Sequence, residues 1–296
     1  MRAIRLIRHG EPLVAENIPD PRPEAGEVIV EMRAAGICHS DGYYRADPTR
    51  TTVPRTLGHE VAGVIAGTKQ RVALHYLLRN GDMIGKEVDG GYAEKIAVPA
   101  ENAIPIPDRV SFEEAAIMMC STATAYHALR LAAFQPGESL AILGFGGLGI
   151  SALLLARKLG AAEVRVVERV PEKLQIALSH GAKADLGSPD VVLDFVGNAD
   201  LTLRALRALK PGGRLMLVAI HLRDMRFDPY ADVLTKERRI IGVSDHTADE
   251  LRELLNMGLD LSPAITRRVP LDASAINSAL DDLDRGTPHL RSVIVR

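Results

Sequence analysis

The only two cysteines in this chain of 296 residues both stand in segments with groups that can bind metals. Cys38 lies in GICHSD and Cys120 in MMCSTATAYHAL, and between them His59 and Glu60 occur in LGHEVAGV. Two thiolates and one imidazole form a catalytic zinc set that leaves a fourth position open for water or substrate. Free cysteine is, however, usually a small buried hydrophobe, and a lone histidine is usually structural. The residue types alone leave both interpretations open.

A second candidate site is the glycine-rich segment GFGGLG (144–149), which fits the pattern G-x-G-x-x-G. It follows a strand-like run and opens a helix-like one, which is the context that gives this weak pattern its meaning. Gly144 permits the tight turn, Gly146 lets the backbone approach a pyrophosphate, and Gly149 allows close helix–strand packing. The helix N-terminus supplies N–H groups and a positive dipole end for the phosphates. The nucleotide-binding residues predicted in this segment are Gly144, Gly146, Gly147, Leu148 and Gly149.

An acidic residue is expected about 20 positions beyond the glycines, where it binds the adenosine ribose hydroxyls. Glu168 stands there, at the end of the next strand-like run. Its neighbour Arg169 could accept a 2′-phosphate, but the acidic side chain opposes that phosphate. The pattern therefore favours NAD over NADP. The alternative is that the glycines only form a turn and that Glu168 is a solvated charge.

The composition excludes several other classes of protein. The chain is 47% hydrophobic and 25% charged, with a net charge of −2 at pH 7, as is typical of a globular protein with a sizeable core. That charge gives no basic field to attract nucleic acid or an anionic membrane. No apolar run approaches the roughly 20 residues of a membrane span, and the N-terminus lacks a secretory apolar core. Two cysteines make no disulfide framework, so we expect a cytoplasmic protein.

The elements that must position these residues differ between the two parts of the chain. Up to about residue 110 the chain is rich in Pro and Gly, and alternating runs at 27–37 and 60–67 predict strands. Ser111 followed by Glu114 predicts a capping box at the start of a helix that extends to about residue 133.

From Ser139 onward, strand-like and helix-like runs alternate, which predicts a doubly wound parallel sheet. We therefore expect an α/β fold with a Rossmann domain of residues 130–243. The remainder, residues 1–129 and 244–296, is expected to form a mainly β, barrel-like catalytic domain.

The segments GICHSDGYY, LGHEVAGV, DGGYAE, CSTATAYHAL, GFGGLG and LRSVIV occur in that order along nearly the whole chain. Together they resemble the zinc-dependent medium-chain alcohol dehydrogenases. The resemblance implies reversible oxidation of a small-molecule alcohol to an aldehyde or ketone, with NAD and a catalytic zinc ion. It also implies a homo-oligomer, either a dimer or a tetramer.

The resemblance also implies roles for residues around the metal. The zinc ligands would be Cys38, His59 and Cys120, with Glu60 able to approach the metal. Asp41 matches the carboxylate that orients the ligand histidine. Ser40 matches the hydroxyl that hydrogen-bonds the substrate oxygen and begins a proton relay.

Further residues match positions that contact the cofactor in the family. His39 and Arg291 match basic groups near the pyrophosphate, and Thr124 matches a residue beside the nicotinamide. Glu168 and Lys173 match a pair that binds the adenosine ribose. Four apolar residues at strand ends would line the nicotinamide, although a place in the core is an open alternative for each of them: Phe195, Val196, Val218 and Ile220.

The chain also departs from the family pattern. Many members carry a second, structural zinc on a lobe with four cysteines, whereas residues 77–91 contain no cysteine, so we expect one zinc only. The segments VIAGTKQRV and HGAKADLGSPDVV are short as well, and the latter leaves little room for a third βα unit. Tyr43 replaces the histidine that often ends the proton relay; with a pKa near 10, it is a poor proton shuttle.

The missing lobe begins just beyond Tyr76, next to the expected substrate pocket. Tyr43, Tyr76 and either Met118 or Met119 would give that pocket an aromatic and apolar lining. We therefore expect bulky hydrophobic secondary alcohols or ketones as substrates. Two other functions stay open, namely a zinc-free reductase of quinones or activated double bonds from the same superfamily, and a non-catalytic member.

Overall fold

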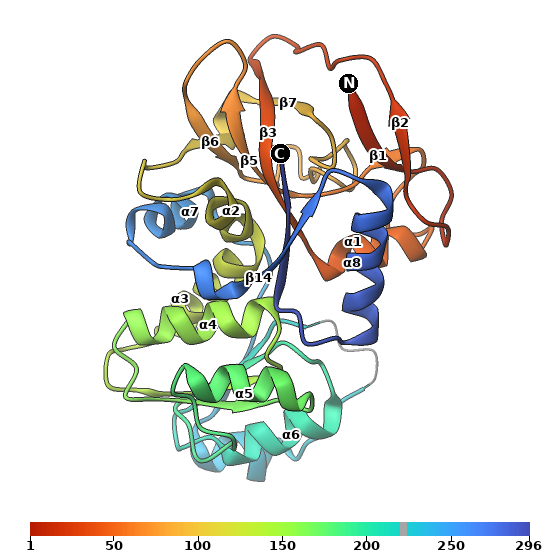
Figure 1. Cartoon of the computed structure of the whole chain (residues 1–296). Coiled ribbons are helices and arrows are strands. Elements are labelled where there is room, and N and C mark those ends of the chain that lie inside the picture. The colour runs from red at the N-terminus through yellow and green to blue at the C-terminus, as the bar shows by residue number, and fades with distance from the viewer. Residues whose placement is uncertain (220–223) are drawn as a thin grey trace. The chain divides into compact units, whose positions relative to one another are not determined.

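The computed structural model describes residues 1–219 and 224–296 and divides into two compact units. The first comprises Met1–Ser121 and Thr247–Arg296, and the second Thr122–His246. Figure 1 shows the strands and helices of both units. Among the described residues, no helix is both long and apolar enough to span a membrane.

Two sheets form most of the first unit. The larger has the strand order β14-β15-β3-β5-β6-β8, with β7 paired to β3, and the smaller has the order β2-β1-β4. Their strands are β1 (Arg2–Leu6), β2 (Val14–Asn17), β3 (Glu27–Ile37), β4 (Arg55–Thr56), β5 (Glu60–Ile65), β6 (Arg71–Leu74), β7 (Lys95–Pro99), β8 (Ala103–Pro105), β14 (Ile265–Pro270) and β15 (Arg291–Val295). The expected strand at 27–37 is confirmed as β3, which pairs with β5, β7 and β15 at the centre of the sheet.

Short helices flank these strands. They are α1 (His39–Ala46), α2 (Phe112–Ile117), α7 (Ala248–Asn256) and α8 (Ala273–Arg285), with 3-10 turns η1 (Ala100–Asn102) and η5 (Ser262–Ala264). The expected capping box is confirmed, because the Ser111 hydroxyl accepts from the Glu114 N–H and the Glu114 carboxylate accepts from the Ser111 N–H.

The helical pattern expected from there to about residue 133 is present, and it contains a π turn. After α2, a π-helical turn η2 (Met118–Thr122) precedes α3 (Ala123–Leu131). A π turn inserts one extra residue into the helical ladder and rotates the side chains that follow, and such turns are frequent at functional sites. Cys120 stands at the middle of this turn.

The second unit contains one five-stranded sheet with the order β10-β9-β11-β12-β13, and every neighbouring pair is parallel. Its strands are β9 (Ser139–Leu143), β10 (Glu163–Val167), β11 (Val191–Asp194), β12 (Arg214–Leu217) and β13 (Arg239–Gly242). Its helices are α3, α4 (Gly147–Lys158), α5 (Pro171–Ser179) and α6 (Ala199–Ala208), with η3 (Pro229–Val233) and η4 (Leu234–Lys236). The chain winds outward in opposite directions from β9 and from β11, so the expected doubly wound sheet is confirmed.

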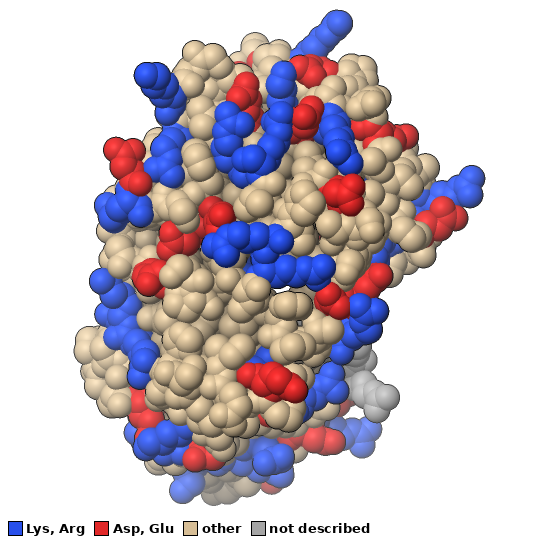
Figure 2. Space-filling view, in the orientation of Figure 1, with Lys and Arg blue, Asp and Glu red and all other residues tan. Residues whose placement is uncertain are grey.

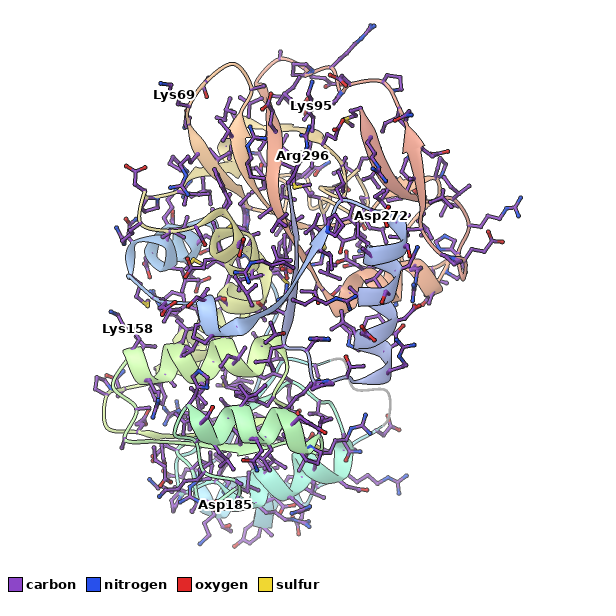
Figure 3. The ribbon with its side chains drawn as sticks, viewed as in Figure 1. Lys69, Lys95, Lys158, Asp185, Asp272 and Arg296 are labelled. Atoms are coloured by element: carbon purple, nitrogen blue, oxygen red, sulfur yellow. The ribbon has the colours of Figure 1, made fainter. Side chains whose placement is uncertain are left out.

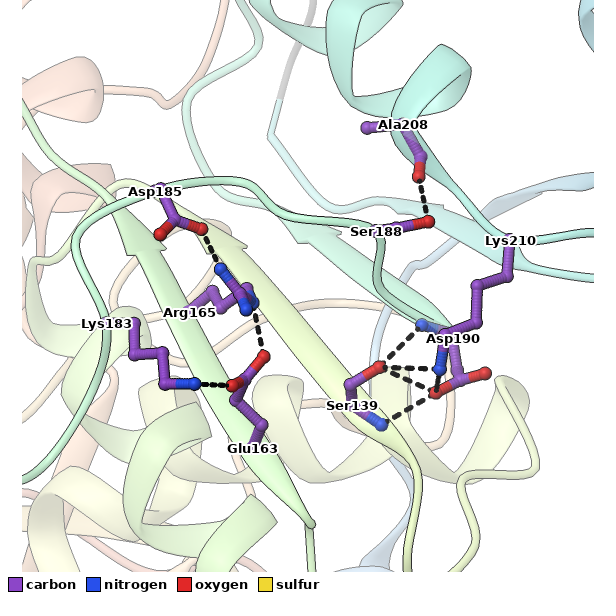
Figure 4. Close-up of polar contacts among 9 residues, drawn as sticks. All are labelled: Ser139, Glu163, Arg165, Lys183, Asp185, Ser188, Asp190, Ala208 and Lys210. Carbon is purple, nitrogen blue, oxygen red and sulfur yellow. Dashed lines mark hydrogen bonds and ion pairs between the residues drawn. The ribbon is translucent and has the colours of Figure 1, made fainter.

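The short segment between α5 and β11 closes the outer edge of this sheet. Lys183 makes a single bridge to β10, with hydrogen bonds from the Val166 N–H to Lys183 O (2.8 Å) and from the Lys183 N–H to Val164 O (3.0 Å). Charged side chains surround the bridge, because the Arg165 guanidinium pairs with Glu163 and Asp185 and the Lys183 ammonium also pairs with Glu163 (Figure 4). A charged, covered edge of this kind resists pairing with other chains.

The other shortened segments are tight turns. Between β5 and β6 the Ile65 N–H donates to Gln70 O at 3.0 Å, and Lys69 lies in this turn at the edge of the unit (Figure 3). In segment 77–91 the Leu78 N–H donates to Asp82 O at 2.8 Å. The last residues of that segment pack behind the turn that carries His59, since the Gly91 N–H donates to Gly58 O at 2.8 Å.

Candidate active site

Four side chains with metal-binding atoms meet inside the first unit. They are Cys38 directly before α1, His59 and Glu60 at the start of β5, and Cys120 in the π turn. One ligand atom from each lies within 4.8 Å of all the others. Within residues 1–219 and 224–296, no other group of three or more such residues meets this criterion.

The donor set suits zinc, since two sulfurs, one imidazole and one carboxylate are ligands that Zn²⁺ accepts. A second observation points to a cation here. Glu60 is fully buried; its Oε2 accepts from Arg291, while its Oε1 has no hydrogen-bond partner. A buried carboxylate oxygen without a partner costs free energy, and a metal ion would satisfy it.

The pKa values of the four clustered side chains are shifted because these groups lie close together and are buried. The Cys120 thiol donates to the Cys38 sulfur and holds the pKa of Cys38 well below its ordinary value, and the pKa of Cys120 is correspondingly raised. Burial would lower the pKa of His59, but the Asp41 carboxylate outweighs it and keeps that pKa well above its ordinary value. Burial raises the pKa of Glu60 to about 7 in spite of the adjacent Arg291.

Asp41 organises the backbone around the cluster from within α1. Its carboxylate is fully buried and accepts from two backbone N–H groups, those of Cys38 (3.1 Å) and Gly58 (3.3 Å). It also accepts from His59 Nδ1 at 3.3 Å, which directs the other ring nitrogen away from Asp41. The fourth donor is the Tyr92 hydroxyl at 2.7 Å, a contact to which the sequence assigned no role.

Arg291 at the start of β15 lies inside this site. Its side chain is almost fully buried, and its guanidinium is ion-paired with Glu60. Gly36 makes room for this pair, because a Cβ there would lie 1.8 Å from a Glu60 carboxylate oxygen. The structure thus gives Arg291 a partner within the metal cluster, and its contact with the cofactor pyrophosphate stays a prediction.

The first half of α1 carries three further candidate residues, namely His39, Ser40 and Tyr43. The Ser40 hydroxyl oxygen lies 3.7 Å from the Cys38 sulfur. The His39 ring stacks on Tyr43 with centroids 4.9 Å apart, and His39 Nε2 lies 3.1 Å from a carboxylate oxygen of Asp284 in α8. The Tyr43 side chain is 45% exposed, with the guanidinium of Arg50 5.6 Å from its ring centroid.

Aromatic rings surround the imidazole of His59. The Tyr76 ring meets it edge-on with centroids 5.5 Å apart, and the Tyr44 ring does so at 6.5 Å. Tyr76 is 4% exposed and therefore mostly covered in this structure. Met118 and Met119, the alternative pocket residues, are both fully buried among the core side chains.

The second unit holds the glycine-rich turn between β9 and α4. Gly144 has φ +87°, and a Cβ on Gly149 would lie 2.5 Å from Gly144 O, so neither position accommodates a side chain. A Cβ on Gly146 would meet no atom within 4 Å, so this side of the turn is open. Gly147 and Leu148 form the first turn of α4, which contains no acidic side chain. An anion would be stabilised at this helix end.

Glu168 follows β10 and faces the same turn. One of its carboxylate oxygens accepts from the Phe145 N–H at 2.7 Å, and the other accepts from the N–H groups of Arg169 and Val170 at 2.7 and 2.8 Å. Burial lowers the pKa of the nearby Lys173, although Glu168 opposes this shift. Arg169 itself is exposed.

The strands β9 and β11 are neighbours at the point where the winding direction reverses, and nucleotide ligands bind at such switch points. Phe195 and Val196 follow β11 there; Val196 is 46% exposed, and a Cβ on Gly144 would lie 2.7 Å from its side chain. Val218 follows β12, and its N–H donates to Asp194 O. Ile220 lies outside the described residues.

Thr124 lies in the first turn of α3 and is half-buried. The start of this helix is tied to α4, because the hydroxyls of Thr122 and Ser151 lie 3.1 Å apart. Thr124 is thereby held near the helix that follows the glycine-rich turn.

Two family models match the chain. The alcohol dehydrogenase GroES-like domain matches residues 24–108, and the zinc-binding dehydrogenase model matches residues 147–259. A protein of Mycobacterium tuberculosis named "Probable zinc-binding alcohol dehydrogenase" is 32% identical over 325 positions, which cover 93% of this chain and 84% of that protein. The chain belongs to the zinc-type medium-chain alcohol dehydrogenase family. It is therefore an oxidoreductase that uses a nicotinamide dinucleotide, NAD or NADP.

The chain is shorter than a relative that it matches along its whole length. The NAD-dependent alcohol dehydrogenase of Sulfurisphaera tokodaii is 28% identical over 350 aligned positions that cover 100% of both chains, although only 296 residues are present here. The solved structure of an alcohol dehydrogenase from Thermus sp. ATN1 is 24% identical, covers 100% of this chain and 99% of its own, and matches with a TM-score of 0.90. The shortened chain therefore keeps the family fold.

Sequence reasoning did not identify two features of this alcohol dehydrogenase. The π turn at Cys120 has no recognisable signal in the segment MMCST. The contact between Tyr92 and Asp41 joins residues 51 positions apart. The segment DGGYAE marks Tyr92 as part of a family motif but gives no indication of what its hydroxyl touches.

Proposed function

We propose that this chain is an NAD-dependent alcohol dehydrogenase with one catalytic zinc, bound by Cys38, His59 and Cys120. The observation that supports this proposal is the buried quartet of ligand atoms within 4.8 Å of one another, in which one Glu60 oxygen lacks a partner. In this proposal the first domain, residues 1–129 and 244–296, carries the metal, and the second domain, residues 130–243, carries the cofactor.

Bound zinc would polarise the alcohol oxygen as a Lewis acid, and the nicotinamide would accept the hydride. The chain's own residues prepare that reaction. Ser40 is placed to hydrogen-bond the substrate oxygen, since its own oxygen lies 3.7 Å from a proposed ligand sulfur. It would take up the alcohol proton while its own hydroxyl proton passes on to water. Asp41 holds the His59 ring, and the Arg291 guanidinium balances the buried charge of Glu60. Burial of the ligands excludes water and strengthens each of these interactions.

The proposed absence of a structural zinc follows from segment 77–91. It contains no cysteine, and both cysteines of the chain belong to the buried quartet. Its turns pack against the backbone of Gly58, so the fold of this segment depends on main-chain contacts.

The proposed preference for NAD over NADP rests on Glu168. Its carboxylate lies against the glycine-rich turn, where a ribose would be bound, and would repel a 2′-phosphate. Arg169 is exposed beside it and is the group that could relax this preference.

Bulky hydrophobic secondary alcohols and the matching cyclic or aryl ketones are the proposed substrates. The Tyr76 ring beside His59 and the exposed Tyr43 ring on α1 would favour apolar groups, and burial contributes about 0.8 kcal/mol per methylene. A cyclic or aryl alcohol is therefore expected to exceed ethanol in kcat/KM by at least about tenfold. Steady-state assays of NAD reduction with a graded series of alcohols would measure this. If ethanol equals or exceeds every larger alcohol, the proposed substrate class is wrong.

The same assay separates this function from the alternatives. A zinc-free reductase of quinones or activated double bonds would reduce those compounds without metal, and a non-catalytic member would oxidise no alcohol. Treatment with a chelator, followed by zinc, is expected to abolish and then restore alcohol oxidation.

We also propose that the protein self-associates. In the described part of the second unit, β13 ends the sheet with β12 as its one partner, and Tyr230 and Leu234 nearby in sequence are 68% and 64% exposed. Light scattering is expected to give a mass of two or four chains of 32.0 kDa. Leu234→Glu should lower that mass, whereas Leu131→Glu, at another exposed leucine of the same unit, should leave it unchanged. A monomeric parent protein would contradict this proposal.

A further inference from the structure

The carboxylate of Asp41 has all of its acceptor positions occupied. A carboxylate offers about four lone-pair sites, and here it accepts from the N–H groups of Cys38 and Gly58, from His59, and from the Tyr92 hydroxyl. The Tyr92 contact is the shortest of the four at 2.7 Å, and the other three range from 3.1 to 3.3 Å. The tyrosine is therefore the closest partner of the group that orients the ligand histidine.

The position of the Tyr92 ring is fixed on several sides. The backbone N–H of Tyr92 donates to Leu57 O at 3.0 Å, and the backbone carbonyl of Tyr92 accepts from the Ile4 N–H at 2.7 Å. The ring is fully buried and lies against Gly58, where a Cβ would approach within 2.3 Å of a ring carbon. Gly58 has φ +94° and directly precedes His59, so the ring packs against the turn that delivers the histidine.

We propose that Tyr92 is a positioning residue for the metal, because its hydroxyl anchors Asp41, which in turn fixes the His59 ring and the Cys38 turn. The inference rests on the proposed function, since it concerns the affinity of the proposed zinc site. The Tyr92 hydroxyl donates to the Asp41 carboxylate, and in this proposal it acts on the ligands through that carboxylate.

The physical reason is geometric. Asp41 is an acceptor, so the His59 Nδ1 atom that faces it carries a proton, and the opposite nitrogen is the one that can offer its lone pair to a metal. Loss of the Tyr92 hydroxyl leaves Asp41 Oδ2 with the Cys38 N–H as its one donor. The carboxylate is then under-satisfied in a buried position and less restrained in rotation, and both effects loosen His59.

The test is Tyr92→Phe, which keeps the ring and removes the hydroxyl. The zinc dissociation constant, measured by competition with a chromophoric chelator, is expected to rise by about ten- to a hundredfold. The visible absorption bands of the Co²⁺-substituted protein are expected to shift or broaden, because they report ligand geometry. Tyr44→Phe is the matched control: it removes another buried hydroxyl near His59 that is not among the donors to Asp41, and it should leave the zinc dissociation constant unchanged.

A double-mutant cycle separates positioning from general loosening of the fold. In an Asp41→Ala background, Tyr92→Phe should add less than about twofold to the zinc dissociation constant, because the group through which it acts is gone. Thermal unfolding of the metal-free proteins shows whether Tyr92→Phe folds; if it does not, Tyr92→Leu supplies a second variant that has neither a hydroxyl nor another hydrogen-bond donor. A parent protein that binds no zinc would overturn the proposed function. Tight zinc binding that Tyr92→Phe leaves unchanged would overturn this inference alone.

Discussion

Replacement of Cys38 by alanine is expected to lower bound zinc from about one equivalent per chain to less than a tenth. Two of the proposed ligands are thiolates, and removal of one leaves a sulfur, an imidazole and a carboxylate that is ion-paired to Arg291. Lewis-acid polarisation of the substrate oxygen is worth several kcal/mol, and each 1.36 kcal/mol is a factor of ten in rate. Alcohol oxidation should therefore fall by roughly a thousandfold or more. Elemental analysis and steady-state kinetics of the purified variant measure both effects.

A buried neighbour provides the control for this experiment. The hydroxyl of Ser121, which follows Cys120 in the π turn, donates to Ile117 O at the end of α2 at 3.0 Å, and Ser121→Ala removes that bond without removing a proposed ligand. This variant should retain its zinc with at most a modest loss of stability. Two equivalents of zinc in the parent protein, or full activity with none, would falsify the proposed single catalytic zinc.

The second large effect is expected on the relative affinities for NADH and NADPH when Glu168 is replaced. For two unit charges about 4 Å apart, repulsion amounts to about 1 kcal/mol in water and about 4 kcal/mol near a protein surface. The parent protein should therefore bind NADH more tightly than NADPH. Glu168→Gln, which removes the charge and keeps one acceptor oxygen for the N–H groups of Arg169 and Val170, should narrow this preference by roughly tenfold or more. Fluorescence titration with NADH and NADPH measures both dissociation constants.

The Glu168→Ala variant separates the effect of the negative charge from the effect of the hydrogen bonds that the carboxylate accepts. The alanine variant loses the acceptor for three backbone N–H groups as well as the charge, so it should bind both cofactors more weakly. Equal affinities for NADH and NADPH in the parent protein would show that Arg169 outweighs the acidic side chain.

Features specified by residues close together in the sequence could be predicted. The strand at 27–37, the capping box at Ser111 and the parallel alternation after Ser139 all appear in the structure, because strand and helix hydrogen bonds follow local residue patterns. The family assignment was predictable for the same reason. Its motifs are short segments, and the comparison with known proteins confirms it.

The π turn at Cys120 shows what local patterns do not specify. The sequence after Ser111 has good helical spacing, and the helical pattern expected to about residue 133 is present as consecutive helical segments up to Leu131. The spacing gives no signal for the π turn within it. Cys120 stands in this turn, and its sulfur lies within 4.8 Å of ligand atoms of Cys38, His59 and Glu60, which are far away in the chain.

By itself, the sequence determined the fold class, the family and the types of residue available for a metal and a dinucleotide. The tertiary structure alone decided which of them meet. Tyr92 reaches Asp41 across 51 positions, Arg291 reaches Glu60 across 231, and Lys183 bridges to the edge strand β10. Contacts between such distant segments arise from the packing of whole sheets and helices, and burial then fixes the partner of each polar group. The spacing of residues along the sequence therefore does not predict these contacts.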